Sequence, residues 1–101
     1  MSETQLVTAA LDYLKAAGIF AARNNTGVRG GIRFGLGKGS ADIIAIVRGR
    51  MVALEAKVDR GVVSQDQLDW MKRVKAAGAY YAVIRSIDDV RAAIAAAKEI
   101  A

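Results

Sequence analysis

The chain of 101 residues contains no cysteine and no histidine. These absences exclude disulfides, thiolate zinc sites, Ser-His-Asp triads and histidine general bases. A metal ion bound by this protein must therefore be held by carboxylates, carbonyl groups and water. Such oxygen donors favour Mg²⁺ or Mn²⁺.

Proline is also absent, and no repeat or linker divides the chain, so we expect one domain over residues 1–101 with a modest core. No apolar run is long enough to span a membrane, and the polar start at residues 1–4 shows no signal peptide. We therefore expect no membrane partner and a cytoplasmic location. Hydrophobic residues make up 53% of the chain, too many for a disordered protein.

The chain is basic, with a formal net charge of +5 from 15 Lys and Arg against 10 Asp and Glu. Solubility alone would account for this balance. A polyanionic partner is the sharper interpretation, because Lys and Arg neutralise phosphates. The charge favours a nucleic-acid partner without establishing one.

The most informative stretch is residues 40–57, S-A-D-I-I-A-I-V-R-G-R-M-V-A-L-E-A-K, which is typical of two strands joined by a tight turn. If a two-residue loop begins at Gly49, position 42 pairs with position 57. Asp42, Glu55 and Lys57 then share one face of the hairpin. Asp42 lies directly opposite Lys57, with the Cβ atoms about 4.5–5.5 Å apart.

Both faces of this predicted hairpin are also apolar. Ile44, Ile46 and Ala53 share the face of the three charges, and Ile43, Val47, Val52 and Leu54 lie on the other. A hairpin of this kind is expected to be covered on both sides. Buried charges must then pair or bind a metal. The spacing does not choose between a structural Asp–Lys pair and a metal site.

Capping signals and periodicity predict the other elements. Ser2 with Gln5 and Ser64 with Gln67 have capping-box spacing, so one helix is expected from Glu3 to a stop at Gly18 and another from residue 64 to 77. The remaining expected elements are strands at 19–23 and 80–85 and a last helix capped by residues 86–89 that runs through residue 97. This order predicts an α/β fold in which helices cover a small mixed sheet around the central hairpin.

Residues 24–39 are rich in glycine and include Arg29, Arg33 and Lys38. Loops of this length in a small domain are usually functional or mobile. Glycine allows the backbone to approach phosphates closely, and the cations attract them. A flexible surface loop without a ligand is the plainer alternative.

Asp42, followed after twelve residues by Glu55-Ala56-Lys57, resembles the core of the PD-(D/E)xK nuclease superfamily. The wider pattern resembles the VRR-NUC family, the virus-type replication-repair nucleases, and in particular its standalone phage members. That pattern comprises an N-terminal helix with Glu3, residues 23–27, the Gly-rich loop that ends at 39–42, and residues 64–67 with Trp70. One departure is Ala41, where the family usually has proline; that proline shapes the strand entry and binds no metal.

The resemblance implies a PD-(D/E)xK-like fold and a Mg²⁺- or Mn²⁺-dependent DNA endonuclease. The implied metal ligands are Glu3, Asp42, Glu55 and the Ala56 carbonyl; the implied catalytic residues are Asp42, Glu55, Lys57 and Gln67; the implied DNA contacts come from Arg23, Asn25, Arg29, Arg33 and Lys38. From the residues alone, Glu3 is also a favourable first-turn acid. Gln67 is also the capping partner of Ser64. One amide is expected not to serve the helix cap and the active site at once.

Standalone relatives are associated with four-way (Holliday) DNA junctions and act as homodimers, so the resemblance implies branched DNA as substrate, a two-fold partner and the cytoplasm of a bacterial host. Either the Ala-rich last helix or Ile32, Phe34 and Leu36 would form the interface. Two alternatives stay open. One is a nuclease of flaps, ends or ordinary duplex, and the other is a DNA-binding module without catalysis.

Overall fold

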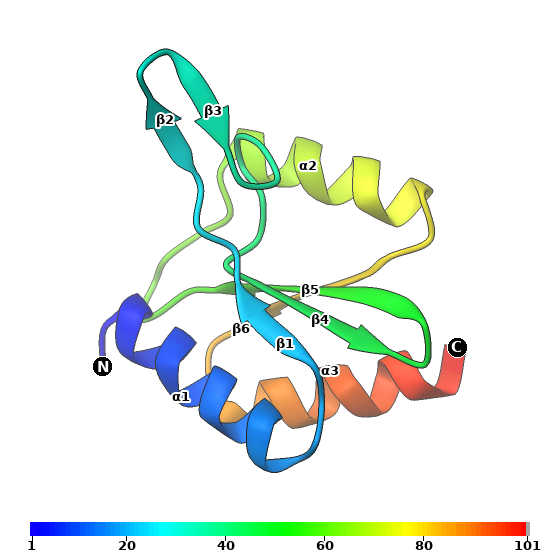
Figure 1. Cartoon of the computed structure of the whole chain (residues 1–101). Helices are drawn as coiled ribbons and strands as arrows, with labels where there is room; N and C mark the ends of the chain where they lie inside the picture. The colour runs from blue at the N-terminus through cyan, green and yellow to red at the C-terminus, as the bar shows by residue number, and fades with distance from the viewer. Residues whose placement is uncertain (101) are drawn as a thin grey trace.

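The computed structural model describes residues 1–100, which form three helices, a four-stranded mixed sheet and a separate two-stranded hairpin (Figure 1). In chain order the elements are α1 (Glu3–Ala16), β1 (Ala21–Arg23), β2 (Gly27–Arg29), β3 (Ile32–Phe34), β4 (Ile43–Val47), β5 (Arg50–Ala56), α2 (Gln65–Ala76), β6 (Tyr80–Ile84) and α3 (Ile87–Ile100). The predicted α/β class is confirmed. Within the described residues, no helix has the length and apolar character needed to cross a membrane.

The sheet has the order β1-β4-β5-β6, with the β4–β5 hairpin at its centre. β1 pairs with β4 and β4 with β5 in antiparallel fashion, whereas β6 joins β5 in parallel after the chain crosses over through α2. Helices α1 and α3 cover one face of the sheet and α2 covers the other (Figure 1). The prediction that the central hairpin is covered on both sides is confirmed.

The two predicted capping boxes are both formed, and each helix begins where its box requires. The Ser2 and Ser64 hydroxyls accept from the third backbone N–H of their helices, and the glutamine there reaches back to the cap. α1 ends just before Gly18, whose φ of +74° suits glycine. The apolar face of α1, including Leu6 and Leu14, then packs into the larger core.

The predicted hairpin register was wrong by one loop position. Val47 pairs with Arg50, so the loop is Arg48–Gly49, with φ values of +51° and +78°. A type I′ turn needs positive φ at both central residues and takes glycine most readily as the second, which explains the shift. Each residue's pairing partner moves by two positions, and side chains alternate between the faces with a period of two. The residues predicted to share a face of the hairpin therefore still do so. Continued beyond Ile43 and Leu54, the observed register sets position 42 opposite position 55, not 57.

The Gly-rich segment is not the plain loop that the sequence predicted, because it contains the β2–β3 hairpin. Gly30 and Gly31 form its two-residue turn, with φ values of +57° and +79°. Such a Gly-Gly turn between V-R and I-R is a hairpin signal in its own right. Figure 1 shows this hairpin extending away from the four-stranded sheet.

Candidate metal-binding and catalytic site

Two carboxylates meet where β4 begins and β5 ends. Glu55 is only 2% exposed, on the sheet face that α2 covers, and Asp42 is half-buried beside it. The pKa of the Glu55 carboxyl is raised from 4.5 to about 8, first by burial and then by Asp42, through repulsion and a shared hydrogen bond. A buried acid with such a pKa beside a second acid is characteristic of functional sites.

Lys57 and Gln67 both approach the same oxygen of Glu55. The Lys57 Nζ lies 3.7 Å from Oε2, and the Gln67 Nε2 donates to Oε2 at 3.0 Å. The charge of Lys57 lowers the Glu55 pKa, but burial outweighs it. The predicted companions of the acidic pair therefore lie at the site, with Lys57 bound to Glu55 and not opposite Asp42.

The expectation that Gln67 cannot fill two roles was wrong. Its Oε1 accepts from the Ser64 backbone N–H at 2.8 Å, completing the helix cap, while its Nε2 donates to Glu55. An amide carries an acceptor and a donor at its two ends, so one side chain serves both partners. The start of α2 is thereby tied to the acidic pair.

Backbone contacts hold Asp42 and orient Ala56. The Asp42 Oδ2 accepts from the Ala56 N–H at 2.9 Å, and the Asp42 carbonyl accepts from the Asn24 N–H at 2.8 Å. The N–H and C=O of one strand residue point to the same side of the strand. The Ala56 carbonyl is therefore directed to the side on which Asp42 lies, as a metal ligand there requires.

Glu3 is less closely engaged than the resemblance implies. It is exposed in the first turn of α1, and its charge makes the smallest contribution to the raised pKa of Glu55. Among residues 1–100, no group of three or more acidic side chains is arranged to hold a metal ion. The described site therefore consists of two carboxylates, a lysine, an amide and a backbone carbonyl.

These donors nevertheless suit a hard divalent cation. The Oε1 atom of Glu55 is buried and receives no hydrogen bond within the described structure. A buried carboxylate oxygen without a partner is costly, and a cation shared with Asp42 would satisfy it and offset their mutual repulsion. Carboxylate and carbonyl oxygens are the ligands that Mg²⁺ and Mn²⁺ prefer.

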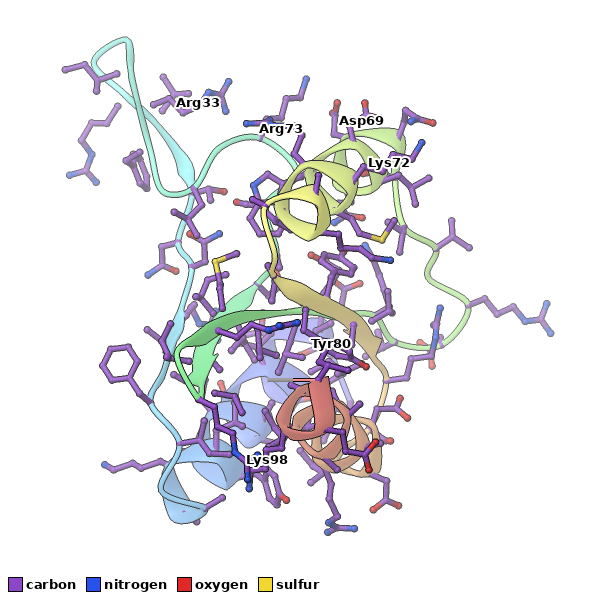
Figure 2. The ribbon with its side chains drawn as sticks, turned by 90° about the vertical axis from the view of Figure 1, so that its right-hand side faces the viewer. Arg33, Asp69, Lys72, Arg73, Tyr80 and Lys98 are labelled. Atoms are coloured by element: carbon purple, nitrogen blue, oxygen red, sulfur yellow. The ribbon has the colours of Figure 1, made fainter. Side chains whose placement is uncertain are left out.

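The cations expected to contact DNA are all exposed. Arg29 and Arg33 lie on the β2–β3 hairpin, and Figure 2 shows Arg33 at the same end of the molecule as Arg73 of α2. Lys38 is 70% exposed and pairs with Asp66 at 3.4 Å.

Arg23 and Asn25, the other two residues expected to contact DNA, are also exposed. Arg23 ends β1, and its Nη2 lies 3.5 Å from the Thr8 hydroxyl. Asn25 lies between β1 and β2, and its carbonyl borders Gly35. No side chain of the expected DNA-contact set therefore shares a hydrogen bond or ion pair with the acidic pair among the described contacts.

Two residues near the site were missed at the sequence level. Asn24 donates to the Ser40 hydroxyl and the Ala41 carbonyl and accepts from the Leu36 N–H, which fastens the Gly-rich segment beside Asp42. Tyr81 of β6 shares the face of Glu55, because Ala53 pairs with Tyr81 in parallel register. Only knowledge of the β5–β6 pairing would have shown the place of Tyr81.

Trp70 is buried against Tyr81 and the sheet, in the core under α2. Its indole N–H donates to the Leu36 carbonyl at 3.1 Å. The Gly-rich segment is thus attached to α2 as well as to β4.

No protein-family model matches the chain, and no curated protein matches it either.

Proposed function

We propose that the protein is a Mg²⁺- or Mn²⁺-dependent DNA endonuclease of the VRR-NUC type. The observation that carries the proposal is the buried Glu55, with a pKa raised to about 8, held beside Asp42 and bound to Lys57. A fold gains little by burying an acid against another acid, because both desolvation and repulsion oppose it. Such a cost is expected where the acids have a ligand.

In this mechanism Asp42, Glu55 and the Ala56 carbonyl would hold the cation, which would lower the pKa of a bound water and neutralise charge on the phosphate. Lys57 orients the attacking water and stabilises the negative charge that develops on the phosphorus oxygens. Gln67 keeps Glu55 facing the site through its hydrogen bond. The buried position of Glu55 limits the water that competes for these groups.

The proposed substrate is branched DNA, cut by a two-fold homodimer. Two active sites related by symmetry suit two symmetric cuts in a four-way junction. Of the two candidate interfaces, the β2–β3 region is favoured: Ile32 is 73% exposed, Leu36 49% and Phe34 44%. On α3, by contrast, Ala93 and Ala97 are already buried in the core.

The test is cleavage of matched four-way junction, fork, flap and duplex substrates in Mg²⁺ and in Mn²⁺, with light scattering to measure the mass of the protein. We expect paired cuts in the junction by a dimer, and loss of cutting in K57A. Cutting of flaps or duplex alone would support the alternative, a nuclease of flaps, ends or ordinary duplex. Tight DNA binding without cleavage in either metal would support a non-catalytic DNA-binding module and refute the nuclease.

A further inference from the structure

The described structure contains two buried side-chain atoms without a hydrogen-bond partner: the Oε1 of Glu55 and the hydroxyl of Tyr81. Both belong to the sheet face that α2 covers, because Tyr81 pairs with Ala53, two residues before Glu55 on β5. Buried polar groups are normally satisfied, so an unpartnered acceptor and an unpartnered donor on one face need a common explanation.

Electrostatics also relates the two residues. The pKa of the Tyr81 phenol is raised to about 12, first by burial, then by repulsion from Glu55 and, to a smaller extent, from Asp42. The phenol therefore keeps its proton up to a pH of about 12. It is a neutral donor within the electrostatic reach of Glu55.

Ionised Glu55 needs such a donor. The two carboxyl groups share a hydrogen bond only while one of them retains a proton. When both are ionised, Oε2 still accepts from Gln67, but Oε1 accepts from no described group. Residues that orient metal ligands by hydrogen bonds are part of a metal site, and their loss typically weakens metal affinity about 10- to 100-fold.

We propose that Tyr81 is a positioning residue, whose hydroxyl donates to the Oε1 side of ionised Glu55, directly or through one water, and orients it for the cation. The inference rests on the proposed function. The ring is held in place by Trp70, whose centroid lies 6.3 Å away. The Tyr81 ring is therefore fixed on the sheet face that also carries Glu55.

The chain provides a matched control in the preceding residue. Tyr80 lies on the opposite face of β6, between the sheet and α3 (Figure 2). Y81F and Y80F each remove one hydroxyl and leave the ring. Since the Tyr81 hydroxyl has no hydrogen-bond partner among the described residues, Y81F should fold with at least the stability of the wild type.

The test measures Mn²⁺ binding by the loss of the free-ion electron paramagnetic resonance signal, without DNA or turnover. We expect Y81F to bind Mn²⁺ about 10- to 100-fold more weakly than wild type and Y80F to bind as wild type. In cleavage, Y81F should raise the Mg²⁺ concentration for half-maximal rate and leave the half-saturating DNA concentration unchanged. Equal Mn²⁺ affinity in Y81F and wild type overturns the inference, whereas a wild type that binds no Mn²⁺ overturns the proposed function itself.

Discussion

The metal-free protein should lose stability as the pH rises from 6 to 9. Folded Glu55 holds its proton to a pKa of about 8, whereas the unfolded carboxyl releases it near 4.5. Between these values the folded state binds more protons, so the contribution of Glu55 is complete below pH 4.5 and is lost as the pH rises through 8. Integrated from pH 6 to pH 9, the loss is about 2.5 kcal/mol at roughly 1.4 kcal/mol per pH unit.

The composition makes this window easy to interpret. With no histidine and no cysteine in the chain, the terminal amine is the main other group that ordinarily titrates between pH 6 and 9. Urea unfolding in a chelator at pH 6 and pH 9 measures the change directly. The matched variant is E55Q, which keeps the shape of the side chain and removes its titration, and its pH dependence should be nearly flat.

Two results would refute this reasoning. The first is a wild-type unfolding free energy that is constant or increases between pH 6 and 9. The second is a pH dependence in E55Q as steep as that of wild type, since another group would then be responsible. Excess Mg²⁺ should reverse the trend in wild type alone, because the cation binds the ionised pair and stabilises the folded state.

Two further predictions concern the Gly-rich segment. R29A/R33A should weaken DNA binding and reduce the salt dependence of its affinity by nearly one unit of slope per lost phosphate contact. K38A removes a cation that is already paired with Asp66, so it should change the slope less. Equal slopes in wild type, R29A/R33A and K38A would contradict DNA contact by Arg29 and Arg33. G39A should lower the unfolding free energy, measured in urea, by about 3 kcal/mol, because the added Cβ would collide with the Asp66 backbone and the φ of residue 39 is +79°. G37A is the control: residue 37 also has positive φ but has open space around it, so the loss should be about 1 kcal/mol. Equal losses in the two variants would contradict the close packing of this segment on α2.

Local signals were sufficient for most of the fold. The capping boxes at Ser2 and Ser64 depend on contacts within one helical turn, so their spacing predicted the starts of α1 and α2. The apolar runs on both faces of the central hairpin predicted its coverage on both sides. The shared face of Asp42, Glu55 and Lys57 followed from alternation, which a change of two in pairing partner leaves intact.

The remaining features depended on details that residue patterns do not carry. The turn residues were misplaced because Arg48, a non-glycine residue, takes positive φ beside Gly49. The position of Tyr81 on the Glu55 face depends on the parallel β5–β6 register. Such a pairing needs a crossover connection, here α2, and local residue patterns do not specify its register. The depth of Glu55 depends on how closely α2 packs on the sheet, and its pKa follows from that depth.

The proposed reaction is hydrolysis of phosphodiester bonds by the acidic pair with a bound divalent cation. It is tested most directly by the initial rate at which supercoiled plasmid is nicked in Mg²⁺, with and without a chelator. The variants are D42N and, as a matched control, D12N, which changes an exposed acid of α1. We expect nicking by wild type and D12N, none in chelator, and a background rate for D42N; nicking that persists in chelator or in D42N would contradict the proposed reaction.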